Sequence, residues 1–374
     1  MDKVSNELYQ ILRCNPHCDQ LRAPIARNYR EEASRFHDIE SLSQYLRESD
    51  PEMPYANRPV ACRSCCHWGQ RKLILSEINF LIDYTTASAE PWTVLYAGAA
   101  PGEHLIQLSN MFPNIKMILY DPAPFSPLLK SFANEHPDVF ELHETFFDEE
   151  RAEYYSQIFS DEKKSKLAFI SDIRSCNPGR DDDETYNHAT SEDMRRQADW
   201  AKTIGPNVAM FKFLLPWTDG FTEYLKGNIY IQPWKPLTST ESRLIVTAED
   251  LKHPCILYDN KKYERQMMFQ NTIGRATIYN HGIRGEGLDF CYDCTSEIIT
   301  LKKYLISKGE MASKQAISQF SKQLSSSITS SGRTLAVEYH KSMTQRPQVA
   351  QFHPRQYRND GKDSFKIMKQ DPKK

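Results

Sequence analysis

The stretch Tyr96-Ala-Gly-Ala-Ala-Pro-Gly-Glu-His104 decides the fold of this 374-residue chain. It overlaps the end of the apolar run Trp92 to Ala97, which is typical of a buried strand, and leads into the helix-like segment Gly102 to Met111. Small residues between a strand and a helix let backbone N–H groups and the helix N-terminus approach a ligand. The stretch therefore predicts a strand, a turn and a helix that form one side of a binding site.

Strand-like and helix-like segments continue to alternate after this stretch. We expect strands at 115–120, 139–142, 166–171 and 208–213, helices at 126–135, 149–160 and 191–204, and a strand pair at 228–232 and 243–247. This alternation favours an α/β fold with an open, mostly parallel sheet and helices on both faces. Ligands of such sheets bind at the carboxyl ends of the strands.

We place the α/β domain at residues 67–309, and we expect it to open with an amphipathic helix from Trp68 to Tyr84. The segments before and after this domain differ from it in composition. Residues 1–66 are interrupted by prolines and predict an N-terminal arm with one helix, Asp38 to Arg47. Residues 310–374 hold 12 Lys and Arg against 5 Asp and Glu, a net charge of +7, against −9 for residues 1–309. We interpret residues 310–374 as a Ser-rich, basic, partly disordered tail, and the acidic segment Cys176 to Asp193 as a polar loop.

Composition excludes several classes of protein. With 40% hydrophobic and 26% charged residues, the chain can bury a large core, unlike a disordered or fibrous protein. The apolar runs are shorter than the roughly 18 residues of a membrane-spanning helix, and the sequence shows no secretory pattern, so we expect an intracellular protein with no membrane partner. Nine cysteines, an odd number, favour reduced thiols. The pairs Cys62/Cys65 and Cys291/Cys294 have zinc-ligand spacing but lie far apart in the sequence, so no metal is predicted.

An acidic residue lies at the end of the second expected strand. Asp121 follows the glycines by about 20 residues, where a carboxylate can accept both hydroxyls of a ribose. Together with the glycine stretch, it indicates an adenosine ligand. The loop runs Ala-Pro-Gly where the dinucleotide fingerprint has its third glycine, which favours S-adenosylmethionine, a ligand without phosphate. A glycine turn that only packs a helix on a strand is the alternative.

Four ionisable residues are expected at the same edge of the sheet. Asp172 and Lys212 come at strand ends, Lys72 lies in the opening helix, and Glu241 precedes the strand at 243–247. Separately, each has a plain structural explanation, such as a lysine on a helix surface. Together they suggest a general base, because a buried lysine whose pKa falls by roughly 3 units from about 10.4 can accept a proton near neutrality. We expect burial and Lys72 to lower the pKa of Lys212, and Asp172 and Glu241 to oppose this shift.

This set resembles the catalytic tetrad of Rossmann-type RNA 2′-O-methyltransferases. More specifically, the chain resembles the poxvirus family of cap-specific mRNA 2′-O-methyltransferases, which has kinetoplastid counterparts, over residues 55–280, and most closely in the segments 67–77, 96–104, 170–175, 212–219 and 239–245. The resemblance implies methyl transfer from S-adenosylmethionine to a ribose 2′-hydroxyl near the mRNA cap, with Lys212 as the base. The residues that it implies for the cofactor are Gln70, Tyr96, Gly98, Gly102, Asp121 and Arg174, with Phe147 as part of the adenine wall and Ala123 where the relative has arginine.

A second implied site is a pocket for the cap. Methylated guanine carries a positive charge, so a cap reader holds it between aromatic faces and offers carboxylates to its N–H groups. The resemblance implies this role for Trp217, Asp219 and Glu264, with Tyr55 as a candidate for the second aromatic. It further implies RNA contacts for Ser239, Thr240 and Arg243. The alternative for Trp217 is a core tryptophan after Pro216.

Three functions remain open at this point. They are 2′-O-methylation of capped mRNA, 2′-O-methylation of an uncapped RNA such as ribosomal RNA, and a non-catalytic RNA-binding subunit, since the poxvirus relative also assists a poly(A) polymerase. The intact Lys-Asp-Lys-Glu set favours an enzyme. We expect capped mRNA as the partner, with a poly(A) polymerase as a further candidate, and a location in the nucleus or in a cytoplasmic viral factory.

Overall fold

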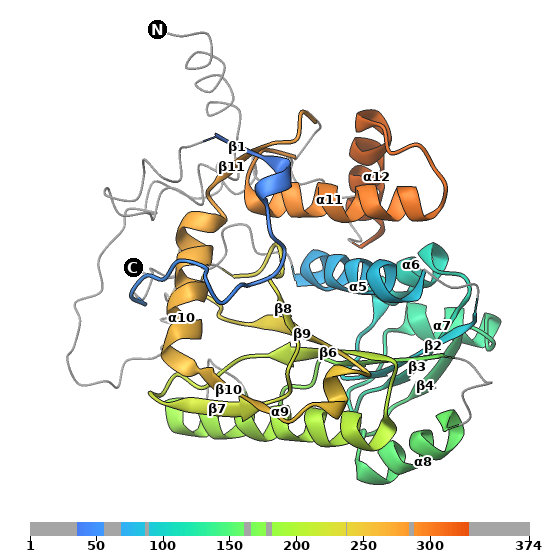
Figure 1. Ribbon diagram of the computed structural model, residues 1–374. Helices are drawn as coiled ribbons and strands as arrows, with labels where there is room; N and C mark the ends of the chain where they lie inside the picture. The colour runs from blue at the N-terminus through green and yellow to red at the C-terminus, as the bar shows by residue number, and fades with distance from the viewer. Residues whose placement is uncertain are drawn as a thin grey trace, which may run out of the picture.

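The computed structural model describes residues 36–55, 69–86, 90–160, 166–176, 182–236, 238–283 and 288–328. Their main feature is a seven-stranded sheet with the order β4-β3-β2-β5-β6-β9-β8 (Figure 1). The strands are β2 (Trp92–Ala97), β3 (Ile115–Tyr120), β4 (Phe140–His143), β5 (Lys166–Ser171), β6 (Val208–Phe213), β8 (Asn228–Tyr230) and β9 (Ser242–Thr247). The five neighbouring strands β4, β3, β2, β5 and β6 are parallel to one another. Strand β9 is antiparallel to both of its neighbours, β6 and β8. The predicted fold class is confirmed.

The helices lie in layers on this sheet (Figure 1). One face is covered by α5 (Gly69–Thr85), α6 (Glu103–Met111) and α7 (Pro127–Glu135), and the other by α8 (Glu149–Phe159) and α9 (Asp183–Ile204). A further layer, α11 (Tyr292–Ser307) and α12 (Lys314–Ser327), packs on α5. Alternate strand residues build two apolar cores, with Val94 and Ile170 in the core that includes α5, and Leu95 and Phe169 in the core that includes α9. Among the described helices, none has the length and apolar character needed to cross a membrane.

Smaller elements surround the main sheet. Strand β1 (Phe36–Asp38) pairs with β11 (Ile278–Asn280), and β7 (Phe221–Tyr224) pairs with β10 (Ile256–Asp259). Helix α10 (Asn260–Phe269) continues into the π-helical turn η4 (Gln270–Gly274), and the short 3-10 turns are η2 (Ile39–Ser41) and η3 (Asp250–Lys252). In Figure 1, β7, β10 and α10 lie near the ends of β6 and β9, whereas β1 and β11 lie beside α11.

The helix predicted from Asp38 to Arg47 is wrong. After the turn η2, the chain runs extended beside β8, where the backbone N–H of Leu46 donates to Ile229 and the N–H of Ile231 donates to Gln44, both at 2.8 Å. The Gln44 side chain also donates to the hydroxyl oxygen of Ser296 in α11 at 2.8 Å. Pairing with a sheet edge therefore overrides the local helical pattern of this segment.

Two polar stretches are helical, contrary to prediction. Asp182 accepts the N–H of Thr185 at 2.8 Å as the N-cap of α9, and the helix dipole favours acidic side chains in the first turn, so the acidic run starts a helix where a loop was predicted. Helix α12 lies beyond residue 310, with Ile317 and Leu324 buried against the core. The rest of the predicted tail, residues 329–374, and residues 1–35 and 56–66 of the predicted arm lie outside the described residues, as do residues 67–68 at the start of the predicted domain, so the domain boundaries stay predictions.

Candidate active site

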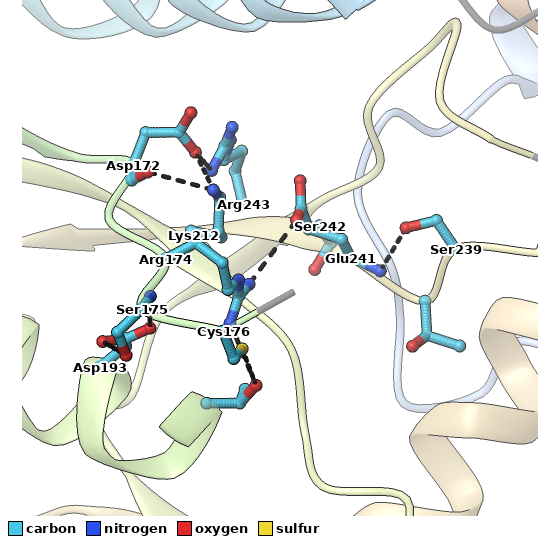
Figure 2. Close-up of polar contacts among 12 residues, drawn as sticks. Asp172, Arg174, Ser175, Cys176, Asp193, Lys212, Ser239, Glu241, Ser242 and Arg243 are labelled. Carbon is cyan, nitrogen blue, oxygen red and sulfur yellow. Dashed lines mark hydrogen bonds and ion pairs between the residues drawn. The ribbon is translucent and has the colours of Figure 1, made fainter. Parts of the chain in front are cut away.

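The carboxyl ends of β5 and β6, the start of β9 and the first turn of α5 bring the four predicted catalytic residues together at one edge of the sheet. Lys212 Nζ lies 3.0 Å from Asp172 Oδ1 and also donates to the main-chain oxygen of Asp172 at 3.0 Å. Lys72 Nζ, from the first turn of α5, donates to Glu241 Oε1 at 2.9 Å. Figure 2 shows the Lys212 and Arg243 side chains pointing toward Asp172. Two linked acid–lysine pairs therefore form the centre of the site.

Lys72 is positioned by the residue before it. The guanidinium of Arg71 is fully buried and binds Glu297 of α11 through two hydrogen bonds, one of which, from Nε to Oε2, measures 2.7 Å. It also donates to the hydroxyls of Ser321 and Ser325 in α12. The C-terminal helices therefore fix the start of α5, and with it Lys72. Sequence reasoning missed this link, because its partners lie more than 220 residues away in the chain.

Burial lowers the pKa of Lys212 below its ordinary value. Asp172 and Glu241 oppose this effect, and Arg174 and Arg243 add to it. The prediction gave Lys72 the role of the second cation, but the structure pairs Lys72 with Glu241 and gives that role to the two arginines. A lysine with a lowered pKa at a strand end is suited to accept a proton.

The two carboxyl groups have lowered pKa values, so both are ionised. Burial alone would raise the pKa of Asp172, but Arg243 and Lys212 outweigh burial and lower it. For Glu241, burial is likewise outweighed by Lys72 and Lys212, and the pKa lies well below its ordinary value. The site therefore holds its lysines between fixed negative charges.

Arg243 belongs to this centre, and the structure argues against the prediction that it contacts RNA. It is 2% exposed, and its Nη1 lies 2.7 Å from Asp172 Oδ1, the oxygen that also faces Lys212. The pairing of β9 with β6 explains why Arg243 lies here, because Arg243 of β9 is the cross-strand partner of Lys212 on β6. Arg174, predicted to bind the cofactor, lies 3.6 Å from Glu241 Oε2 through its Nη2 and donates to Thr190 at 3.2 Å.

The glycine loop has the shape that the sequence predicts. Gly98 and Gly102 have φ angles of 85° and 72°, in the left-handed region that favours glycine. A Cβ at Gly98 would lie 2.8 Å from the carbonyl carbon of Asp172, and one at Gly102 would lie 2.7 Å from a methyl carbon of Leu129. Glycine therefore lets the loop pass close to the end of β5. Gln70 lies in the first turn of α5 and is partly exposed.

Asp121 follows β3 and anchors this loop. Its carboxylate accepts the N–H of Ala100 at 2.9 Å and that of Ala123 at 2.8 Å, so one carboxylate holds the loop and its own turn. Phe147, which stays a prediction for the adenine wall, is 7% exposed and packs in the core against Tyr120 and Trp200. Its neighbour Phe146 is 71% exposed and offers a free aromatic face after β4. Phe146 is therefore the more accessible of the two candidates for an adenine face.

Tyr96 has its side chain in the core beneath the loop. It is 3% exposed, and its hydroxyl donates to Glu77 Oε1 at 3.0 Å, where His104 Nε2 also lies at 3.1 Å. The prediction that Tyr96 contacts the cofactor therefore applies to its backbone alone. This buried acid–histidine pair joins α5 to α6 below the glycine loop, and sequence reasoning did not identify it.

Two of the predicted cap residues, Trp217 and Glu264, are linked through Lys261 of α10. Trp217 stacks on Tyr186 of α9, with ring centroids 4.7 Å apart and an interplanar angle of 16°. Lys261 Nζ donates to the main-chain oxygen of Trp217 at 2.8 Å and to Glu264 at 3.1 Å, so one lysine holds the aromatic residue and the acid together. Trp217 is only partly buried, in contrast to the core tryptophan that was the alternative. The structure adds Tyr186 and Lys261 to this group.

The remaining RNA candidates differ in exposure. Asp219 is exposed, and Ser239 is partly exposed, with its hydroxyl accepting the N–H of Glu241 at 3.1 Å. Thr240 is 5% exposed, which argues against the predicted contact of its side chain with RNA. Tyr55 ends a segment that runs along α10, where the N–H of Met53 donates to the main-chain oxygen of Arg265 at 3.1 Å.

Comparison with known proteins identifies the family. A sequence profile described as the poly A polymerase regulatory subunit matches residues 39–330. The cap-specific mRNA (nucleoside-2′-O-)-methyltransferases of two Myxoma virus strains, Lausanne and Uriarra, are each 28% identical over 283 residues, 71% of this chain and 80% of the relative. Among solved structures, coclaurine N-methyltransferase bound to N-methylheliamine and SAH aligns over 92% of this chain and 81% of its own, but at 9% identity and a TM-score of 0.22 the likeness carries no argument. Because the profile spans most of its length, the chain belongs to the family of poly(A) polymerase regulatory subunits.

Proposed function

We propose that the chain transfers a methyl group from S-adenosylmethionine to the ribose 2′-hydroxyl of a cap-proximal nucleotide of mRNA. The observation that carries this proposal is Lys212, whose Nζ is held 3.0 Å from Asp172 at the sheet edge of the glycine loop and whose pKa burial lowers. The names of the Myxoma virus relatives support the same reaction.

The residues around the glycine loop fit S-adenosylmethionine. Side chains at Gly98 and Gly102 would collide with neighbouring atoms, so the loop backbone stays bare and close to the end of β5. The Asp121 carboxylate suits a ribose, and the exposed ring of Phe146 suits an adenine face. When bound, S-adenosylmethionine supplies a methyl group on a sulfonium, which a nucleophilic oxygen can accept.

The chain's own residues activate that oxygen. In its neutral form, Lys212 Nζ accepts the proton that the 2′-hydroxyl loses, and Oδ1 and the main-chain oxygen of Asp172 hold this nitrogen in place. Lys72 adds a positive charge that stabilises the developing oxyanion, while Glu241 fixes its position through the 2.9 Å hydrogen bond. The tetrad therefore provides a base and an electrostatic support at fixed positions.

Trp217, Asp219 and Glu264 provide the proposed preference for the cap. An aromatic face binds a cationic ring more tightly than a neutral one, by roughly 2 kcal/mol when water is excluded, which is a factor of about 30. Tyr186 braces Trp217 through the stacked contact, and Lys261 braces both Trp217 and Glu264. This bracing reduces the entropy lost when the guanine binds.

The test compares labelled methyl transfer to N7-methylguanosine-capped, guanosine-capped and uncapped RNA of one sequence, followed by mapping of the methylated nucleotide. We expect modification of a cap-proximal ribose and at least several-fold lower activity without N7 methylation. Trp217→Ala should remove that preference and leave binding of S-adenosylhomocysteine unchanged. Equal activity on all three RNAs would favour the alternative, 2′-O-methylation of uncapped RNA.

A second proposed function, stimulation of a poly(A) polymerase, is supported by the family match over residues 39–330. The test adds the chain to the poly(A) polymerase of the same source and measures the length of the tails. Lys212→Ala serves as the control that separates the functions, because stimulation by a bound subunit needs no proton acceptor. Stimulation that persists in this variant supports a separate role, and the absence of both stimulation and binding would contradict it.

A further inference from the structure

A buried cluster of metal-ligand side chains lies at the start of α11, in the helical layer that packs on α5 (Figure 1). Asp289, Cys291 and Cys294 are each exposed by no more than 1%. A carboxylate oxygen and the two sulfur atoms lie within 4.8 Å of one another. None of these residues belongs to the proposed catalytic, cofactor or cap site, so the cluster calls for an explanation of its own.

The local backbone directs these three side chains toward one another. Cys291 is the N-cap residue of α11 and Cys294 lies in its first turn, which places the two thiols on the same side of the helix start. The N–H of Cys291 donates to Asp289 Oδ1 at 2.9 Å, and the N–H of Asp289 donates to Cys294 Sγ at 3.3 Å. Such backbone bonds orient metal ligands, and a helix N-terminus favours thiolates.

Charge also favours a cation at this point. In their ionised form, these three ligands are costly together in the protein interior unless a positive charge is present. The guanidinium of Arg275, a buried cation in the same region, forms three hydrogen bonds of 2.7 to 3.1 Å with Asp293, a carboxylate outside the cluster. A metal ion would balance the cluster itself.

We propose that Asp289, Cys291 and Cys294 bind a zinc ion. Zinc is bound in proteins by cysteine sulfur and by aspartate oxygen, and thiolates favour it over magnesium or calcium. A tetrahedral zinc has a fourth position, which these three residues leave to a further ligand. The sequence predicted no metal because its two Cys-x-x-Cys pairs are far apart, whereas the fold adds Asp289 to one of them.

The site would act on the structure of the enzyme. Helix α11, which starts at this cluster, carries Glu297, the buried partner of Arg71, and Arg71 precedes Lys72. A zinc ion at the start of α11 would therefore hold the helix that fixes the first turn of α5. Its role is structural, because metal binding contributes directly to folding free energy.

The first experiment measures the metal content of the full chain after purification from zinc-supplemented cells in metal-free buffer. We expect about one zinc per chain in the wild type, and a loss of most of it in Cys291→Ser/Cys294→Ser and in Asp289→Asn. The matched control is Cys176→Ser/Cys255→Ser, which removes two thiols outside the cluster and should keep the zinc. Wild-type protein without stoichiometric metal, or unchanged zinc in the Cys291/Cys294 variant, would overturn the proposal.

A second measurement uses wild-type protein, so it does not depend on the folding of a variant. Reconstitution with Co²⁺ after removal of zinc should give the sulfur-to-cobalt charge-transfer absorption of thiolate ligands, and a chelator should lower the thermal midpoint until zinc is added back. Absence of the charge-transfer band, or a disulfide between Cys291 and Cys294 detected by mass spectrometry in the wild type, would show that the thiols do not bind metal.

Discussion

Replacing Arg243 by methionine removes a positive charge that lies next to Lys212. Arg243 Nη1 and Lys212 Nζ form ion pairs with the same Asp172 oxygen, at 2.7 and 3.0 Å, so the two nitrogens lie less than about 6 Å apart. In the variant, the repulsion between the two cations disappears, and Asp172 acts on Lys212 without a competing partner. Both changes favour the protonated amine, so the pKa of Lys212 should rise.

The size of this shift follows from the separation. At about 6 Å, the repulsion between two unit charges is about 0.7 kcal/mol at the dielectric constant of water and about 3 kcal/mol at an effective value of about 20. Because one pKa unit corresponds to about 1.4 kcal/mol, the pKa should rise by about 0.5 to 2 units. At a pH below the pKa of the base, the neutral fraction of Lys212 should then fall by about 3-fold to 100-fold.

The assay is single-turnover methyl transfer to capped RNA at saturating cofactor, measured as a function of pH. The acidic limb of the profile should move to higher pH by about 0.5 to 2 units, and the rate should recover above the new pKa. Arg151→Met is the matched control, because it removes an arginine from a surface pair with Asp148 on α8. Since Arg243 is buried, circular dichroism and cofactor binding must first show that the variant is folded. An acidic limb that stays in place in a folded variant would refute the reasoning.

Three further predictions concern single residues. Lys212→Arg should abolish methyl transfer with cofactor affinity within a few-fold of wild type, because a guanidinium stays protonated; an active variant in the transfer assay would contradict the assignment of the base. Asp121→Ala should weaken binding of S-adenosylhomocysteine by about 2 to 4 kcal/mol in calorimetry, because the carboxylate is proposed to hold the ribose and also anchors the loop; unchanged affinity would contradict this role. Arg71→Met should lower the free energy of unfolding in urea by about 3 to 5 kcal/mol, because the Glu297 charge stays buried without its cation, and Arg71→Met/Glu297→Gln, which removes that charge and keeps an acceptor for Trp234, should recover part of this loss; an equal loss in both variants would contradict the pairing.

The main sheet could be predicted from the sequence because its strands are buried and short. The strands at 92–97, 115–120, 166–171 and 208–213 have the predicted bounds. Each is an apolar run ended by turn residues, and parallel strands covered on both faces read in this way. The convergence of Lys72, Asp172, Lys212 and Glu241 followed from strand ends and from the family resemblance.

The parts that were missed depend on contacts between distant segments. The position of Arg243 is set by the register of β9 on β6, which no local pattern in the sequence records. Ser325 looked like part of a linker, but it is buried in α12, where its hydroxyl accepts a hydrogen bond from Arg71. Which of Phe146 and Phe147 is exposed depends on which of the two rings packs in the core. Two adjacent aromatic residues in a sequence do not indicate which of them will be buried.

The antiparallel return of β9 has a consequence for how substrate preference can change. Lys212 lies near the end of β6, and Glu241 immediately precedes β9, so the chain leaves the catalytic centre and comes back to it. The part of this excursion between β6 and β8 carries the proposed cap residues Trp217 and Asp219, and the main sheet holds it at both ends. Insertions or replacements within this excursion need not move the base or its partners. Natural variation or engineering can therefore alter which RNA end is accepted while the methyl-transfer machinery stays intact.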